Sequence, residues 1–152
     1  MLEMDKTALL IVDIQGVLAR TVYEANLIYG NWQKLIKAAQ LFQLPIVLME
    51  QNPRGLGPTI PELRELLGDL PAIEKMTFNA CLNEEFLKRL REIGREQILV
   101  AGVEAHVCVY QTVCGLLKEP YQIYVASDAV SSRTSWNRMR ALERMRELGA
   151  VI

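Results

Sequence analysis

Five short apolar segments alternate along the chain with longer stretches of helical spacing. Each segment is a continuous run of mostly β-branched or aliphatic residues, without the apolar and polar alternation of a half-exposed strand. Continuous runs are typical of strands in a parallel sheet that is covered by helices on both faces. The predicted strands are Ala8–Ile14, Ile46–Glu50, Ala72–Met76, Gln97–Gly102 and Gln122–Ser127, and Ala150–Ile152 can begin a sixth.

The stretches between the strands predict four helices, and an apolar stripe runs from Leu27 to Phe42 in the first. Asn83 is suited to cap the second, because Glu84 and Glu85 follow it in the first turn. This alternation predicts an α/β fold, a three-layer doubly wound (Rossmann-like) parallel sheet. In such folds ligands bind at the carboxyl ends of the strands, beside the switch point in strand order. The predicted helices are Tyr23–Phe42, Asn83–Ile93, Val107–Leu117 and Ser135–Leu148.

Composition indicates one domain over residues 1–152 and narrows the expected partners. The chain has 51% hydrophobic residues, which is ample for a single core. Its 17 basic and 18 acidic residues give a net charge of −1, so we expect neither nucleic acid nor a membrane as a partner. One local basic cluster is interleaved with glutamates at helical spacing, and we interpret it as a solvated helix face. Its members are Arg133, Arg138, Arg140, Arg144 and Arg146.

The amino terminus and the cysteines indicate a cytoplasmic protein. Asp13 interrupts the only apolar run near the amino terminus and no basic region precedes that run, so a secretory signal is not expected. No stretch reaches the roughly 18 apolar residues that a membrane span needs. The three cysteines form no C-x-x-C pair and the chain has one histidine, which predicts neither a disulfide framework nor a metal site.

Three polar residues stand where predicted strands end. Asp13 ends the run LLIVD in the first strand, Lys75 ends the run AIEK in the third, and Cys108 lies near the amino end of the helix after the fourth. Because the carboxyl ends of parallel strands meet at one edge of a sheet, we expect the three side chains to lie close together. A carboxylate, an ammonium and a thiol in one place are suited to acyl transfer from an amide-like substrate to water.

The chemistry of this trio gives each residue a role. A free thiol has a pKa of about 8.5, and a helix amino terminus and a nearby ammonium are expected to lower that of Cys108. Asp13 can take the thiol proton and later hand it to a leaving group, while Lys75 holds the charge of Asp13. Backbone N–H groups before Cys108 can stabilise an oxyanion, an effect often worth about 3 kcal/mol per donor.

Each residue alone has an ordinary explanation, and only the three together are informative. Cys108 can be inert packing, which is how we interpret the other two cysteines, and Lys75 can form a surface pair with Glu74. His106 is an alternative base for the thiol. Residues two apart on a helix point to different faces, however, so His106 meets Cys108 only if the turn between them is not helical.

These residues resemble the isochorismatase-like cysteine hydrolases, and in particular the branch of isochorismatase domain-containing proteins. The resemblance covers nearly the whole chain in the family's order. The matching stretches are LLIVDIQ (9–15), EQNPRGLGPTIPEL (50–63), EKMTFNA (74–80), LVAGVEAHVCVYQT (99–112) and SDAVSSRTSWNRMRALERMRELGA (127–150).

The resemblance implies a fold and a site. It implies a six-stranded sheet of order 3-2-1-4-5-6, no cofactor, and assembly into a homo-oligomer, a dimer or larger. Asp13 matches the family's general base and acid, Lys75 its lysine, and Cys108 its nucleophile, which forms a thioester acyl-enzyme that water resolves. A cis peptide would join Val103 and Glu104 and would aim the backbone N–H of Glu104, with that of Cys108, at the oxyanion.

Departures from the family pattern narrow the expected activity. Glu50–Pro53 holds none of the histidines with which related nicotinamidases bind a metal at this place, so we expect no metal. Leu18 stands near the position where an aromatic residue often lines the family's pocket. Relatives usually continue into a last strand and helix beyond the position of Ile152. The predicted pocket residues are Gln15, Leu18, Gln51, Phe78 and His106.

The sequence therefore predicts a cytoplasmic, metal-free cysteine hydrolase that acts on a small amide, ureido or similar acyl compound. Two alternatives stay open. True isochorismatases cleave a vinyl ether without a cysteine nucleophile, so in the first alternative Asp13 does the acid–base work and Cys108 does not attack. In the second, the chain is a catalytically idle, oligomeric binding protein.

Overall fold

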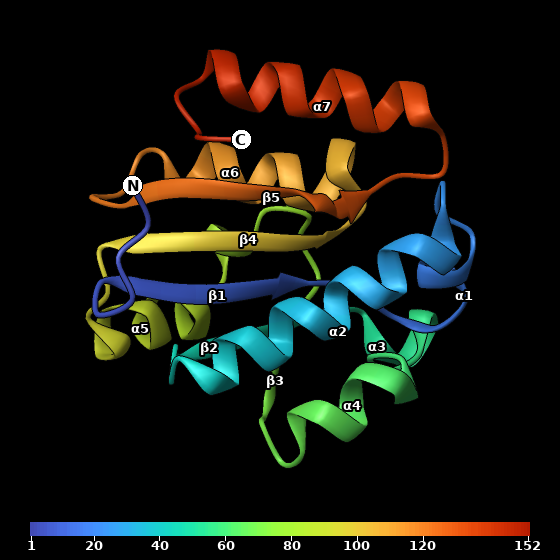
Figure 1. Ribbon diagram of the computed structural model, residues 1–152, viewed down its shortest axis with the longest axis horizontal. Coiled ribbons are helices and arrows are strands. Elements are labelled where there is room, and N and C mark those ends of the chain that lie inside the picture. The colour runs from blue at the N-terminus through green and yellow to red at the C-terminus, as the bar shows by residue number, and fades with distance from the viewer.

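Five parallel strands form the centre of the computed structural model, which describes residues 1–152 (Figure 1). Their order across the sheet is β3-β2-β1-β4-β5, so β1 and β4 are neighbours at the switch point. The predicted α/β fold with a parallel sheet is confirmed. The strands are β1 (Thr7–Val12), β2 (Ile46–Gln51), β3 (Ala72–Lys75), β4 (Gln97–Val103) and β5 (Gln122–Ser131).

Helices cover both faces of the sheet. On one face α1, α2 and α4 pack against Leu9 and Ile11 of β1, and on the other α5, α6 and α7 pack with Leu10 and Val12 (Figure 1). Alternate residues of β1 therefore enter two separate cores, which explains its unbroken apolar run. The helices are α1 (Gly16–Arg20), α2 (Ala25–Leu41), α3 (Pro53–Leu56), α4 (Pro61–Leu67), α5 (Glu84–Ile93), α6 (Tyr110–Leu116) and α7 (Ser135–Glu147), with the 3-10 turn η1 (Ala80–Leu82) and the π-helical turn η2 (Ala105–Val109).

The expected sixth strand is reduced to a single bridge. Val151 pairs in parallel with Tyr124 on the free edge of β5. The N–H of Val125 donates to the carbonyl of Val151 at 2.8 Å, and the N–H of Val151 donates to the carbonyl of Ile123 at 2.9 Å. The segment thus lies where a sixth strand is expected, but this one pair leaves a five-stranded sheet.

The apolar stripe predicted for α2 is wrong at both ends. Leu27 and Phe42 are 63% and 51% exposed, whereas Ile28 and Trp32 fill the core. Adjacent residues of a helix point about 100° apart, so the buried face follows Ile28 and the residues spaced three or four positions beyond it. None of the helices combines the length and the apolar character that crossing a bilayer requires.

The close approach of β1 and β4 gives the first prediction. Gly102 lies opposite Val12 in the ladder at φ +133°, and a Cβ on Gly102 would overlap the backbone carbonyl of Val12. We expect Gly102→Ala to lower the free energy of unfolding by about 3 kcal/mol or more, measured by urea denaturation. Gly30→Ala is the control, because a Cβ at Gly30 of α2 meets no atom within 4 Å.

In this control a helix-interior alanine should be neutral or stabilising by up to about 1 kcal/mol. Equal urea midpoints for Gly102→Ala and the unchanged protein would contradict the packing described for β1 and β4.

Candidate functional site

The three residues singled out in the sequence meet at the carboxyl edge of the sheet. Asp13 follows β1 and turns out of the strand with φ 54°, and Lys75 is the last residue of β3. Nζ of Lys75 donates to Oδ2 of Asp13 at 2.7 Å, and both side chains are wholly buried. Cys108, in η2 after β4, is 6% exposed. The alternative in which Lys75 pairs with Glu74 at the surface is therefore wrong.

Gln51 provides a second hydrogen-bond acceptor for the buried ammonium of Lys75. It is the last residue of β2, which lies between β1 and β3, and it stands beside Lys75 in the strand register. Its Oε1 accepts from Nζ of Lys75 at 2.7 Å. Lys75 therefore reaches across β2 to Asp13 with its ammonium fixed by two oxygens. Gln51 was predicted as a pocket residue, and its contact with Lys75 was not predicted.

The side chain of Gln15 hydrogen-bonds the backbone of Gln51 and Gly57 and is not available to a ligand. It is fully buried. Its Oε1 accepts from the N–H of Gln51 at 2.7 Å, and its Nε2 donates to the carbonyls of Gln51 at 3.1 Å and Gly57 at 2.6 Å. The prediction of Gln15 as a pocket residue is corrected accordingly, because every polar atom of its amide is engaged with backbone.

Glu50, near the end of β2, accepts hydrogen bonds from the loop that follows α3. Oε1 of Glu50 accepts from the N–H of Thr59 at 2.7 Å and from its hydroxyl at 2.6 Å, which fastens the loop after α3 to the end of β2. Beside Glu50, Gln51 is engaged with Lys75. No three His, Cys, Asp or Glu side chains of residues 1–152 are grouped so as to hold a metal ion.

Burial dominates the ionisation of Asp13. It raises the pKa of the Asp13 carboxyl, against the charge and hydrogen bond of Lys75 and a hydrogen bond from Cys108, which lower it. Oδ1 of Asp13 is buried and has no oxygen or nitrogen partner. It is therefore the free acceptor of the site, on a carboxylate that is more basic than an ordinary aspartate.

The surroundings of Cys108 disfavour its thiolate form. Burial raises its pKa to about 12, and the charge of Asp13 adds to this effect more than the charge of Lys75 offsets it. The expectation of a lowered pKa for Cys108 is wrong, because that expectation counted the ammonium and the helix terminus but neither the loss of water nor the opposing carboxylate. An attack by this sulfur needs a base to remove its proton, and Asp13 is the adjacent base.

His106 is held away from this role. Its Nδ1 lies 3.0 Å from Oγ of Ser132, and its Nε2 lies 3.3 Å from Nδ2 of Asn137 in the first turn of α7. The ring nitrogens are thus engaged by Ser132, which lies between β5 and α7, and by Asn137 of α7. This arrangement argues against the alternative in which His106 activates Cys108.

The turn that carries Cys108 begins with a cis peptide between Val103 and Glu104. The carboxylate of Glu104 accepts from Nε of Arg133 at 3.1 Å and from the Arg133 N–H at 3.3 Å. The prediction that Arg133 lies on a solvated helix face is therefore wrong. The helical spacing of its neighbours hid the contact, because Arg133 precedes α7 and is not part of it.

The two remaining pocket candidates, Phe78 and Leu18, differ in their exposure. Phe78 is 52% exposed in the segment after β3, and Leu18 of α1 is half-buried against the core on the α2 face.

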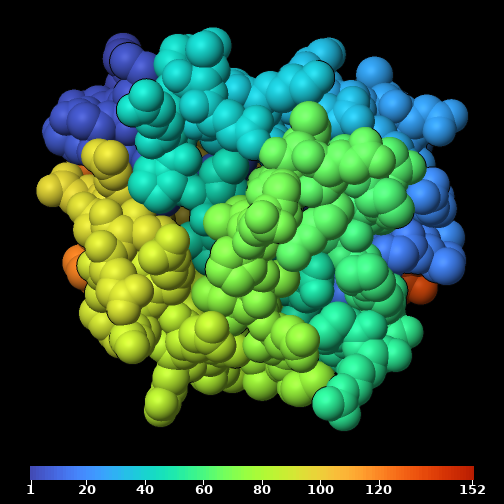
Figure 2. Space-filling model, turned by 90° about the horizontal axis from the view of Figure 1, so that it is seen from below, coloured from blue at the N-terminus to red at the C-terminus, as the bar shows by residue number.

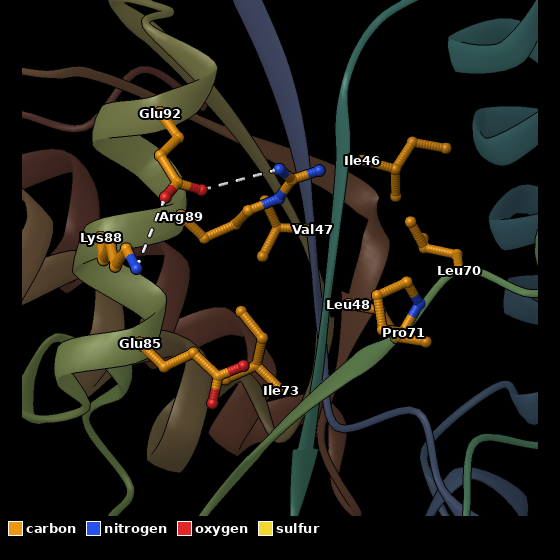
Figure 3. Close-up of a pocket in the computed structure, with 10 residues that line it drawn as sticks. All are labelled: Ile46, Val47, Leu48, Leu70, Pro71, Ile73, Glu85, Lys88, Arg89 and Glu92. Carbon is orange, nitrogen blue, oxygen red and sulfur yellow. Dashed lines mark ion pairs between the residues drawn. The ribbon is translucent and has the colours of Figure 1, made fainter.

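The face with α4, β3 and α5 is seen in Figure 2. A separate cavity of about 210 Å³ lies at the amino ends of β2 and β3 (Figure 3). The ion pairs of Glu92 with Lys88 and Arg89 border it, at the edge of the sheet opposite the site.

Comparisons with known proteins show which family this chain resembles in sequence and fold. The chain is 36% identical over 149 residues to isochorismatase family protein 1A of Dictyostelium discoideum, covering 95% of this chain and 72% of that protein. It superimposes on the MAR1 ribonuclease of Caenorhabditis elegans with a TM-score of 0.92 and 33% identity, over 99% of this chain and 78% of that one.

It is equally similar to YcaC from Pseudomonas aeruginosa, solved with hexane-2,5-diol and covalent acrylamide, and to YcaC from Escherichia coli, an octameric hydrolase of unknown specificity. Both comparisons give a TM-score of 0.93 and 32% identity, over 99% of this chain and 76% of the other. The Isochorismatase domain model matches residues 7–152. The chain therefore belongs to the isochorismatase family, which supports hydrolase activity.

Proposed function

We propose that this protein is a cysteine-dependent hydrolase of a small amide, ureido or similar acyl compound. The observation that carries the proposal is the buried Asp13–Lys75 ion pair at 2.7 Å, next to the one cysteine whose pKa responds to both partners. A structural ion pair needs no thiol, and a packing cysteine needs no buried carboxylate with a free oxygen. Together they supply the nucleophile, the base and a fixed positive charge.

The first half of the reaction forms a thioester. Asp13 takes the proton of the Cys108 thiol as sulfur attacks the acyl carbon, and the carbonyl π electrons move to oxygen. Lys75 offsets the growing negative charge, and backbone N–H groups of Glu104 and Cys108 hydrogen-bond the oxyanion. The tetrahedral intermediate then reforms the carbonyl, breaks the bond to nitrogen, and the leaving amine takes the proton from Asp13.

The second half returns the enzyme to its starting state. Asp13, again a carboxylate, removes a proton from water as the water oxygen attacks the thioester carbon. When the second tetrahedral intermediate collapses, the carbon–sulfur bond breaks and Cys108 recovers its proton from Asp13. The raised pKa of Asp13 suits both directions of this transfer, because a catalytic acid–base group works best with a pKa near the working pH.

The relatives support two further parts of the proposal. Acrylamide bonds to nucleophilic side chains, so the covalent acrylamide in the Pseudomonas aeruginosa YcaC structure supports the presence of a nucleophilic side chain in this family. The octameric Escherichia coli YcaC supports a homo-oligomeric state for this chain. The three free cysteines of this chain favour the cytoplasm as its compartment, because the cytoplasm keeps thiols reduced.

The ionisation of the site also favours a second candidate, cleavage of a vinyl ether. A carboxyl with a raised pKa can act as an acid, and a thiol with a pKa of about 12 is a poor nucleophile until a base activates it. In this candidate Asp13 protonates the substrate and Cys108 forms no covalent bond. Catalysis would then survive the loss of the sulfur.

Alkylation by iodoacetamide, located by peptide mass spectrometry, tests whether Asp13 activates Cys108. Cys81 is the internal control, because burial and then Glu119 raise its pKa to the same value of about 12, without a neighbouring aspartate–lysine pair. It is also more exposed than Cys108. If Asp13 acts as base, Cys108 should react at least about tenfold faster than Cys81 at pH 7 to 8.

The pH dependence has a definite sign. The Cys108 rate should fall as pH drops through the raised pKa of Asp13, above the ordinary aspartate value of about 3.9, because the protonated carboxyl cannot accept the thiol proton. A Cys108 that reacts no faster than Cys81 across this range would refute the proposed activation, and the trio would be packing or part of a binding site.

A further inference from the structure

We propose that the Glu104–Arg133 pair is a positioning device for the oxyanion-binding turn, so that Arg133 sets the turnover rate without touching the substrate. The inference rests on the proposed function. The pair joins two parts of the chain. One is the start of the η2 turn, which carries Cys108, and the other is the connection between β5 and α7.

Glu104 hydrogen-bonds both parts of the chain, Arg133 through its side chain and the η2 turn through its backbone carbonyl. Its side chain is 9% exposed, and Oε2 accepts from Nε of Arg133 at 3.1 Å and from the Arg133 N–H at 3.3 Å. Its backbone carbonyl accepts from the N–H groups of Val107 at 3.0 Å and Val109 at 3.2 Å. These two residues flank Cys108, so a rotation of Glu104 displaces the backbone that carries the nucleophile.

The neighbouring residue makes a second attachment to the same connection. Oγ of Ser132 lies 3.4 Å from the His106 N–H and 3.0 Å from its Nδ1, while Asn137 holds Nε2. Oε2 of Glu104 also lies 3.9 Å from Nδ1 of His106. The Glu104 carboxylate is nearly buried, so removal of the Arg133 guanidinium leaves it with the Arg133 N–H as its remaining hydrogen bond at 3.3 Å.

Displaced donors matter more for turnover than for alkylation. Amide hydrolysis develops an oxyanion that the turn must bind, and a misplacement of about 1 Å can lower a rate about a hundredfold. Alkylation by iodoacetamide is a direct displacement at carbon and forms no oxyanion. A positioning role for Arg133 therefore predicts a loss in the first reaction with little change in the second.

The experiment measures kcat, KM and the Cys108 alkylation rate of the intact protein, with an amide or ureide that the wild type hydrolyses. For Arg133→Ala we expect kcat to fall about 10- to 100-fold, with KM and the alkylation rate changed less than about threefold. Glu104→Gln, which keeps an acceptor for Arg133, should retain more kcat than Glu104→Ala. Arg140→Ala is the matched control, since it breaks the exposed pair with Glu143 at 2.7 Å and should leave all three values unchanged.

Each other outcome has a separate meaning. A wild type with neither turnover nor accelerated alkylation overturns the proposed function and this inference with it. An active wild type with an unchanged Arg133→Ala overturns the positioning role alone. Equal losses of turnover and alkylation in Arg133→Ala indicate general disruption and overturn it too, and a rise in KM at constant kcat assigns Arg133 to substrate binding instead.

Discussion

Asp13→Asn is expected to abolish hydrolysis and to remove the accelerated alkylation of Cys108 near neutral pH, while Cys108 still reacts at higher pH as its own thiolate forms. Loss of a general acid–base group lowers a rate by about 10²- to 10⁴-fold, and here the same group serves in both halves of the reaction. Alkylation behaves differently because the Asp13 charge raises the pKa of Cys108 and the Lys75 charge lowers it. With the carboxylate removed, the pKa of Cys108 should fall below about 12.

In the Asp13→Asn variant, the alkylation rate of Cys108 should no longer change with pH near the pKa of Asp13. It should increase only as the pH approaches the pKa of the Cys108 thiol. Turnover and the pH dependence of alkylation are measured on the same preparations. Asp69→Asn is the control, since Asp69 is exposed and lies in the turn between α4 and β3. An Asp13→Asn protein that hydrolyses the substrate at the wild-type rate would remove Asp13 from the mechanism.

Cys108→Ala distinguishes the two chemical candidates in the same assay. An acyl-enzyme mechanism loses turnover in this variant, and rapid-quench mass spectrometry of the wild type should find the acyl group on Cys108. A vinyl-ether mechanism keeps its activity without the sulfur and loses it in Asp13→Asn. Activity loss in both variants thus supports the thioester route, because only that route needs both residues.

The meeting of the trio could be predicted from sequence because it depends on topology. Parallel strands end at one edge of the sheet, so residues that follow β1, end β3 and follow β4 are brought together even though Asp13 and Lys75 are 62 positions apart. The short helices α1, α3 and α4 were not predicted, since stretches of five, four and seven residues are too short for apolar periodicity to identify.

The ionisation and the bracing of the site could not be predicted in this way. The pKa of Cys108 depends on how much water the packed structure removes, and a sequence does not give that quantity. Side-chain contacts such as Gln51 with Lys75 and Glu104 with Arg133 depend on register and loop path. Arg133 lies in the stretch 127–150 that resembles the family, but the basic helix that follows made it look like one more member of the arginine cluster.

Removal of Lys75 tests the same ion pair through stability. Lys75→Met keeps most of the side-chain volume but leaves the wholly buried Asp13 carboxylate without its cation. Breaking a buried pair from one side lowers the free energy of unfolding by about 3–5 kcal/mol, which we expect to see in urea denaturation at pH 7. Lys88→Met, which removes an exposed pair with Glu92, should change it by less than about 0.5 kcal/mol.

A second substitution separates the lost charge from lost packing. Asp13→Asn added to Lys75→Met removes the unpaired carboxylate, so the double variant should be more stable than Lys75→Met alone. The pH dependence has the matching sign. A carboxyl whose pKa is higher in the folded than in the unfolded state loses stability as pH rises through the folded value, and without Lys75 that value rises further. Lys75→Met should therefore regain stability as the pH is lowered from 7 to 5, and the double variant should not. Equal losses in the single and double variants would mean that the lysine stem, and not the ion pair, stabilises this edge of the sheet.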